Sequence, residues 1–118
     1  MSLSKREIEQ QIPLLVNRLQ GLDVAKVILF GSFAYGKPSE VSDIDLMVVL
    51  NSDFYPTTYQ EKSDLYLQVA RVIRDIRQQV PVDLIVHTNA MHERFMEMNS
   101  LFAKEIRQKG KVIYEADH

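Results

Sequence analysis

The stretch LFGSFAYGKPSEVSDIDLMVV, Leu29–Val49, is the most informative part of this chain. Its second half is apolar and is typical of a buried strand, yet Asp43 and Asp45 stand two residues apart at the start of that strand. Side chains alternate along a strand, so residues i and i+2 share a face. We therefore expect the two carboxylates to point the same way at the mouth of a hydrophobic strand.

Two carboxylates on one face repel each other, and partial burial increases the cost of charging both. A divalent cation is the simplest compensation, because carboxylate oxygens suit Mg²⁺ or Mn²⁺. The alternative is that Asp43 and Asp45 only end a strand at a solvent-exposed edge, and for this pair alone that interpretation is favoured. Three further features favour the cation site.

The first two features concern the turn before the pair. Gly31 and Ser32 directly follow an apolar strand, where glycine permits a tight turn and turn amides can hold phosphate oxygens. Ten residues separate Ser32 from Asp43. A hairpin-like return of this length places the turn and the carboxylates at the same edge of a sheet.

The third feature is Asp83, which lies within the apolar run PVDLIV. A charge among such neighbours is costly unless it is paired or ligated. If this strand lies beside the one that starts at Asp43, three carboxylates converge, as a two-metal phosphoryl or nucleotidyl transfer site requires.

Composition limits the remaining possibilities. The chain has 118 residues, so we expect one domain over residues 1–118, and 46% hydrophobic residues allow a real core. The net charge of −2 argues against direct nucleic-acid binding, which needs a basic face. Cysteine is absent, which excludes disulfides and cysteine chemistry. No signal peptide or membrane-spanning run is recognisable, so we expect a cytoplasmic protein with no membrane partner.

Hydrophobic periodicity predicts an α+β fold, an α/β sandwich in which helices cover a small mixed β-sheet. Apolar residues at helical spacing predict the helices, and short β-branched runs predict the strands. The expected helices are residues 4–20, with a break near Pro13, 58–79, and 90–109 in two pieces that meet near Asn99; the expected strands are 24–30, 43–50, 82–86 and 111–114.

The order of these motifs resembles the nucleotidyltransferase superfamily of DNA polymerase beta type: Gly-Ser, about ten residues, Asp-x-Asp, and a third Asp on a later strand. The run GSFAYGKPSEVSDIDLMVVL is similar to the minimal nucleotidyltransferases, the MNT proteins. The resemblance extends from about Lys26 to Tyr114 and implies a nucleotidyltransferase fold.

The resemblance implies a role for each matching residue. Gly31 and Ser32 would hold the triphosphate of ATP or another NTP, and Asp43 and Asp45 would bind two Mg²⁺ ions, with Mn²⁺ as an alternative. Asp83 would bind the second metal and help to deprotonate an attacking hydroxyl. Catalytic and metal roles thus fall on Asp43, Asp45 and Asp83.

One position departs from the family pattern. Many relatives carry a basic residue where this chain has Tyr35, just before Gly36. The role of that residue is then missing here or passes to Lys37. Tyr35 would instead stack on a base or face a partner.

MNT proteins are similar to the antitoxins of two-gene modules whose other member is a HEPN-domain toxin. The resemblance implies transfer of AMP from ATP to a tyrosine hydroxyl of that toxin. A catalytically weak antitoxin that neutralises its partner by binding is an open alternative, and so is a transferase acting on a small molecule or RNA. A homo-oligomer also stays open.

Several other residues have plainer interpretations. His87 and His92 are expected to be strand-end or loop residues, because hard metals prefer oxygen. Arg71, Arg74 and Arg77 are expected on a solvated helix face, although Arg74 could reach a bound anion. A methionine and phenylalanine cluster is expected to be core, with an adaptable partner face as the alternative: Met91, Phe95, Met96, Met98 and Phe102.

Overall fold

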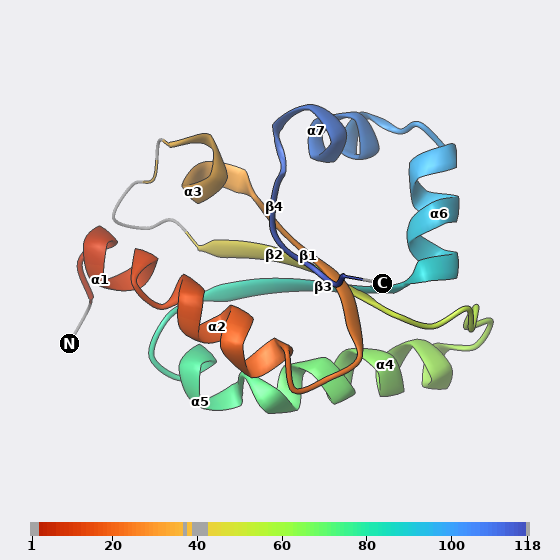
Figure 1. The fold of residues 1–118 in the computed structure, drawn as a ribbon, viewed down its shortest axis with the longest axis horizontal. Coiled ribbons are helices and arrows are strands. Elements are labelled where there is room, and N and C mark those ends of the chain that lie inside the picture. The colour runs from red at the N-terminus through yellow and green to blue at the C-terminus, as the bar shows by residue number, and fades with distance from the viewer. Residues whose placement is uncertain (1–2, 37, 39–42, 118) are drawn as a thin grey trace.

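Four strands form one mixed sheet in the order β3-β2-β1-β4 (Figure 1). The computed structural model describes residues 3–36, 38 and 43–117. The central strands β1 and β2 are the most apolar segments of the chain, and β-branched residues suit their buried, pleated surface. The strand bounds are β1 Val24–Phe30, β2 Ile44–Leu50, β3 Val82–Thr88 and β4 Lys111–Glu115.

The strand directions differ across the sheet. Strand β1 pairs antiparallel with both β2 and β4, whereas β2 and β3 run parallel. A parallel pair needs a long crossover connection. Here the crossover is the segment from Asn51 to Pro81, which contains helices α4 and α5.

Seven helices in the described residues flank the sheet. Figure 1 shows α2, α4 and α5 below the sheet, α3 and α7 above it, α1 beside its left end and α6 beside its right end. Ser4 and Thr58 begin α1 and α4 with capping boxes, in which the hydroxyl accepts a hydrogen bond from the backbone N–H three residues on. The bounds are α1 Lys5–Glu9, α2 Ile12–Leu19, α3 Gly31–Tyr35, α4 Tyr59–Val72, α5 Arg74–Arg77, α6 Asn89–Glu97 and α7 Leu101–Lys109.

The two faces of the sheet bury unequal cores. The larger core holds alternate residues of β1 and β2, such as Leu46 and Val48, against α2, α4 and α5. The smaller core lies on the other face, where Met47 and Phe30 contact residues of α6 and α7. The strand alternation therefore assigns the side chains of odd-numbered β2 residues to the α6–α7 face.

These observations confirm the predicted α+β class with a small mixed sheet covered by helices. The first helix breaks at Gln10–Gln11, just before Pro13, and the last helical region divides at Asn99, whose φ is 52°. The turn that begins at Gly31 forms a short helix over residues 31–35. Lys37 lies outside the described residues.

Three details differ from the predictions. The helix expected over 58–79 is interrupted at Ile73, whose backbone leaves the helical region while its side chain is fully buried. Strand β3 continues beyond residue 86 to Thr88, which is buried and caps α6. Met98 is 68% exposed, so it does not belong to the core expected for the methionine and phenylalanine cluster.

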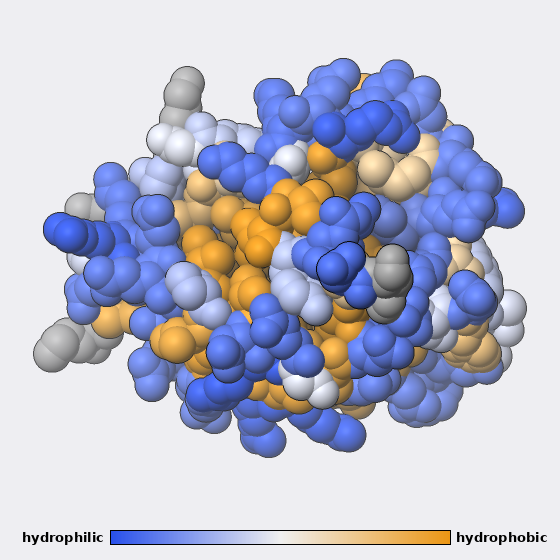
Figure 2. All heavy atoms as spheres, viewed as in Figure 1, coloured by the Kyte–Doolittle hydropathy of each residue, from blue (hydrophilic) through white to orange (hydrophobic). Residues whose placement is uncertain are grey.

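The surface is mainly hydrophilic, but apolar atoms gather in the middle of the face seen in Figure 2, between the α2, α3 and β4 regions. Val112 of β4 and Leu14 of α2 are both about half exposed. Within residues 3–36, 38 and 43–117, no helix is both long enough and apolar enough to cross a membrane.

Leu46 provides a test of the larger core, since its side chain is completely buried in β2. We expect Leu46→Ala to lower the free energy of unfolding by about 2–5 kcal/mol, because it removes buried methyl groups and leaves a cavity. Urea unfolding followed by circular dichroism measures this change. Leu101→Ala is the control, because Leu101 is 85% exposed; an equal loss in both variants would contradict the assigned core.

Candidate active site

Asp45 and Asp83 are direct neighbours on adjacent parallel strands. Strand β2 pairs with β3 in a register that places Asp45 opposite Asp83. Residues that pair in this way share a face of the sheet. Two residues further on, Met47 and Ile85 contact the smaller core, so both carboxylates belong to the α6–α7 face.

Gly31 packs directly against the Asp45 carboxylate. Antiparallel pairing sets Phe30, the last residue of β1, opposite Asp45, so the next residue must turn at that carboxylate. Gly31 has a φ of 74°, and a Cβ atom built on it would overlap Asp45 Oδ2. Glycine is therefore required at this position for two reasons: the backbone is left-handed, and there is no space for a Cβ atom.

Ser32 is the second residue of α3 and is half-buried. The first backbone N–H groups of a helix have no partner within that helix. The N-terminal turn of α3, with Gly31 and Ser32, thus begins beside the Asp45 carboxylate. The structure places the predicted phosphate-binding turn and the predicted acidic pair at the same end of the sheet, on the left in Figure 1.

The electrostatics of Asp45 are unfavourable for its charged form. Burial, followed by the neighbouring charges of Asp83, Asp43 and Glu105, raises the pKa of Asp45 to about 6. Asp43 lies immediately before β2 and is exposed, as is Asp83. Of the two ion pairs between described residues, neither involves these three aspartates. A bound cation is the kind of group that would offset their repulsion.

The donors have suitable chemistry for a hard divalent cation, since carboxylate oxygens are the preferred ligands of Mg²⁺. Asp45 and Asp83 form a close pair that suits such a cation. Asp43 is near enough for its charge to raise the pKa of Asp45. In the part of the chain that the structure describes, no group of three or more His, Cys, Asp or Glu side chains is arranged to hold a metal ion. The convergence of all three aspartates stays a prediction.

Two residues of α7 near the site were not anticipated from the sequence. Glu105 contributes to the raised pKa of both Asp45 and Tyr35. The Lys109 ammonium lies 5.6 Å from the centre of the Tyr35 ring. In the sequence, both residues look like ordinary solvent-exposed charges on a helix. Only the packing of α7 beside α3 brings them close to the candidate site.

Tyr35 is half-buried, and its hydroxyl oxygen has no hydrogen-bond partner among the described residues. Burial raises the pKa of the Tyr35 phenol, and the charges of Glu105 and Asp45 act in the same direction. The ring packs against the larger core. Lys109 thus brings a cation to the ring of Tyr35.

His87 and His92 lie further along the same face. Their Nδ1 atoms are 3.1 Å apart, so one ring donates to the other. Burial, then the proximity of His92, lowers the pKa of His87 to about 4, and burial also lowers the pKa of His92. His87 is the penultimate residue of β3, in agreement with the strand-end prediction. His92 lies within α6, so the strand-end or loop position expected for it is wrong.

Comparison with known families now decides the class of the protein. The family "Polymerase beta, Nucleotidyltransferase" matches residues 13–118. The chain belongs to this family. The match covers α2 through β4 and therefore includes every residue of the site described above. The predicted enzyme class, nucleotidyltransferase, is confirmed.

A relative from Methanocaldococcus jannaschii bears the name "Putative protein adenylyltransferase MJ0604". It is 26% identical over 110 residues, which are 93% of this chain and 97% of the relative. This similarity extends over nearly the whole of both proteins.

Solved structures share the fold. The structure of "a putative nucleotidyltransferase from Sulfolobus solfataricus" has a TM-score of 0.60 at 18% identity, and the match covers 98% of this chain and 90% of that one. A toxin–antitoxin structure with AMP-PNP has a TM-score of 0.54 at 18% identity, with coverages of 92% and 74%. A mutant of the toxin–antitoxin MntA-HpeT has a TM-score of 0.53 at 17% identity, with coverages of 89% and 72%. These similarities confirm the predicted nucleotidyltransferase fold.

Gly31→Ala tests the close packing at the site. The added methyl group would meet the Asp45 carboxylate, and the backbone φ of 74° disfavours alanine. We expect a loss of nucleotidyl transfer of on the order of 100-fold, since displaced charged groups lose their preorganisation. Gly36→Ala is the matched control: its φ is 77°, but its Cβ would meet nothing within 4 Å. Equal activity of the two variants would contradict the proposed role of this contact.

Asp45→Asn tests the electrostatics in the metal-free protein. Folding raises the pKa of Asp45 from 3.8 to about 6. Between these values the folded state retains a proton that the unfolded state loses, so the free energy of unfolding falls as pH rises through this window. We expect Asp45→Asn to raise the melting temperature at about pH 7 and to leave it nearly unchanged below about pH 4.

Melting curves in the presence of a chelator measure this difference, with Asp53→Asn as the control because Asp53 is an exposed loop carboxylate. If Asp45→Asn melts at the wild-type temperature at both pH values, Asp45 does not carry the assigned electrostatic cost.

Proposed function

We propose that this nucleotidyltransferase transfers AMP from ATP to a tyrosine hydroxyl of a partner HEPN-domain toxin, and that it acts as the antitoxin of that pair. The observation that carries the proposal is the alignment of Asp45 with Asp83, directly against the turn at Gly31. It brings oxygen ligands and a phosphate-binding turn to one end of the sheet.

The reaction is an in-line displacement at the α-phosphorus. The acceptor oxygen forms a new bond to that phosphorus, the bond to pyrophosphate breaks, and the hydroxyl proton leaves to a base or to water. Gly31, Ser32 and the first amides of α3 orient the triphosphate, and Asp83 helps to receive the proton. This role for the chain is positioning and charge neutralisation, with no covalent intermediate.

Asp43, Asp45 and Asp83 are the residues that would hold two Mg²⁺ ions, with Mn²⁺ as an alternative. When bound, these ions neutralise the charge that develops on the phosphate and lower the pKa of the attacking hydroxyl. The chemistry of the donors and the raised pKa of Asp45 support this assignment. Without a counter-charge the carboxylates oppose one another, which favours cation binding.

The partner is inferred from the relatives. The M. jannaschii protein is named as a protein adenylyltransferase, and two of the structures with this fold are toxin–antitoxin structures. These names support a protein acceptor over a small molecule or RNA. The net charge of −2 also gives no support to RNA as acceptor.

Transfer of labelled AMP tests the proposal. The chain is incubated with α-labelled ATP, Mg²⁺ and the protein encoded by the neighbouring gene, and label on tyrosine is identified by mass spectrometry. We expect Asp45→Asn and Asp83→Asn each to reduce transfer by on the order of 100-fold or more. Asp53→Asn is the control and keeps wild-type transfer. Transfer that is equal in all variants, or absent from wild type, would overturn the proposal.

A second candidate is an antitoxin that neutralises its partner by binding alone. It is favoured by Tyr35, which replaces the basic residue of many relatives and whose hydroxyl is buried. A growth assay with the toxin distinguishes the two functions. Rescue by Asp43→Ala/Asp45→Ala supports neutralisation by binding, whereas lost rescue with retained toxin binding supports catalysis.

A further inference from the structure

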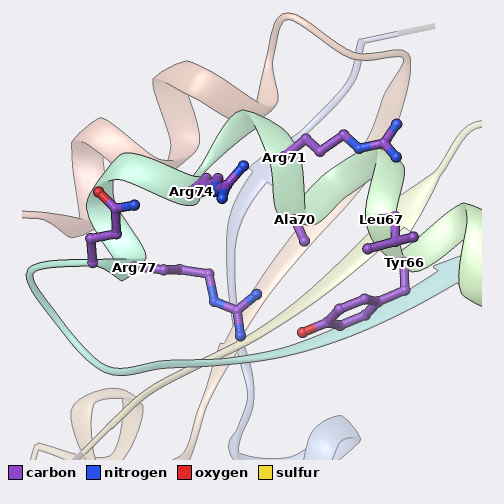
Figure 3. A pocket seen from close by; sticks show the side chains of 7 residues that line it. Tyr66, Leu67, Ala70, Arg71, Arg74 and Arg77 are labelled. Atoms are coloured by element: carbon purple, nitrogen blue, oxygen red, sulfur yellow. The ribbon is translucent and has the colours of Figure 1, made fainter.

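A cleft lies on α4 and α5, on the opposite side of the sheet from the aspartates (Figure 3). Its volume is about 460 Å³. Most of the polar groups in its wall are guanidinium groups, and its apolar part comes from a leucine and an alanine. The lining residues are Tyr66, Leu67, Ala70, Arg71, Arg74, Arg77 and Gln78.

Among the described residues, no carboxylate forms an ion pair with the arginines of this cleft. Neither of the two ion pairs between described residues includes Arg71, Arg74 or Arg77. Asp75, the one carboxylate in α5, accepts hydrogen bonds of 2.6 and 2.7 Å from both terminal nitrogens of Arg18 on α2. Three permanently charged groups thus gather in a chain whose net charge is −2.

The location connects this cleft with the candidate active site. Among the described residues, β3 is an edge strand of the sheet and pairs with β2 alone. Helix α5 ends at Arg77, and the chain then enters β3, which carries Asp83. Figure 1 shows α5 at the same end of the sheet as the starts of β2 and β3. Helix α5 and Asp83 therefore lie at the same end of the sheet.

The arrangement favours an extended ligand with several negative charges. The arginines stand at three-residue intervals, and Figure 3 shows that the Arg71 and Arg77 guanidinium groups do not converge on one point. A single phosphate would need such convergence. Leu67 is 41% exposed, so an apolar side chain of the ligand can also be accommodated.

The occupied face of Tyr66 argues against nucleic acid. Single-stranded nucleic acids use free aromatic faces on which bases stack. Here the Arg77 guanidinium lies 5.9 Å from the centre of the Tyr66 ring and covers it. A mixed acidic and apolar peptide fits both the arginines and Leu67.

We propose that this arginine cleft binds an acidic segment of the protein that accepts AMP, and so holds the acceptor at the open edge of the sheet. The proposal rests on the proposed function for the identity of the partner. Arginine forks bind carboxylates through paired hydrogen bonds, which gives both affinity and orientation. The cleft is a docking site and takes no part in the chemical step.

Peptide binding tests the cleft without any catalytic activity. The probe is a fluorescein-labelled peptide rich in glutamate with one leucine, and fluorescence anisotropy measures its affinity at low and at raised salt. We expect wild type to bind it and Arg71→Gln/Arg74→Gln/Arg77→Gln to bind at least about tenfold more weakly, with a smaller salt dependence. Equal affinity of the two proteins would overturn the proposal.

The charge-matched control replaces three exposed lysines elsewhere, Lys5→Gln/Lys62→Gln/Lys111→Gln. It lowers the net charge by the same amount and is expected to bind the peptide like wild type. The same peptide with glutamine in place of every glutamate must bind wild type at least about tenfold more weakly, a comparison that needs no variant of the chain and so stays decisive even if the arginine variant folds poorly. Tripolyphosphate and a single-stranded RNA are run as competitors. If either occupies the cleft more tightly than the acidic peptide, the assigned occupant is wrong.

A kinetic measurement separates docking from catalysis. With the acceptor protein, the arginine variant is expected to raise KM for the acceptor about tenfold while kcat and the affinity for MgATP stay at wild-type values. A fall in kcat alone would contradict a docking role. Absence of transfer in wild type, with peptide binding intact, would refute the proposed function and leave the acidic-segment site standing.

Discussion

The contact between Gly31 and the Asp45 carboxylate is the constraint on which the site depends. Strand β1 must end opposite Asp45 because of its antiparallel register with β2, so the chain turns directly over that side chain. Only a residue without a Cβ fits, and the same residue begins α3. The predicted phosphate-binding turn and the acidic strand start are therefore held together by backbone geometry and not by flexible side chains.

The two faces of the sheet differ: one carries most of the buried core, and the other carries the candidate active site. The face toward α1, α2, α4 and α5 carries the larger aliphatic core, in which Leu46 and Val48 are fully buried. The other face carries a smaller core beneath α6 and α7, and one end of it is left for Asp45 and Asp83. Because paired residues share a face, the charged pair does not disturb the larger core. Burial and the repulsion between carboxylates raise the pKa of Asp45 to about 6, and such a group is tolerable only with a supporting core.

Local patterns in the sequence were sufficient for most of the fold. Short β-branched runs marked β1 and β2, and apolar residues at helical spacing marked the helices. The interruption at Ile73 carries no Gly or Pro signal; it arises where the chain keeps both Ile73 and Ile76 buried. The extension of β3 to Thr88 was also missed, because His87 and Thr88 are polar. Their place in the strand depends on pairing with β2 and on the buried hydrogen bond from Thr88 to the Phe54 carbonyl.

The sequence by itself determined which residue types were available for the chemistry: a glycine after an apolar strand, two aspartates at strand alternation, and a third aspartate in an apolar run. The tertiary structure decided the parallel register that sets Asp83 beside Asp45, the approach of Glu105 and Lys109 from α7, and the grouping of three arginines around one cleft. The reason is physical. Strand alternation and helix spacing act over a few residues and can be read along the chain, whereas register and helix docking depend on how distant side chains fill one shared core.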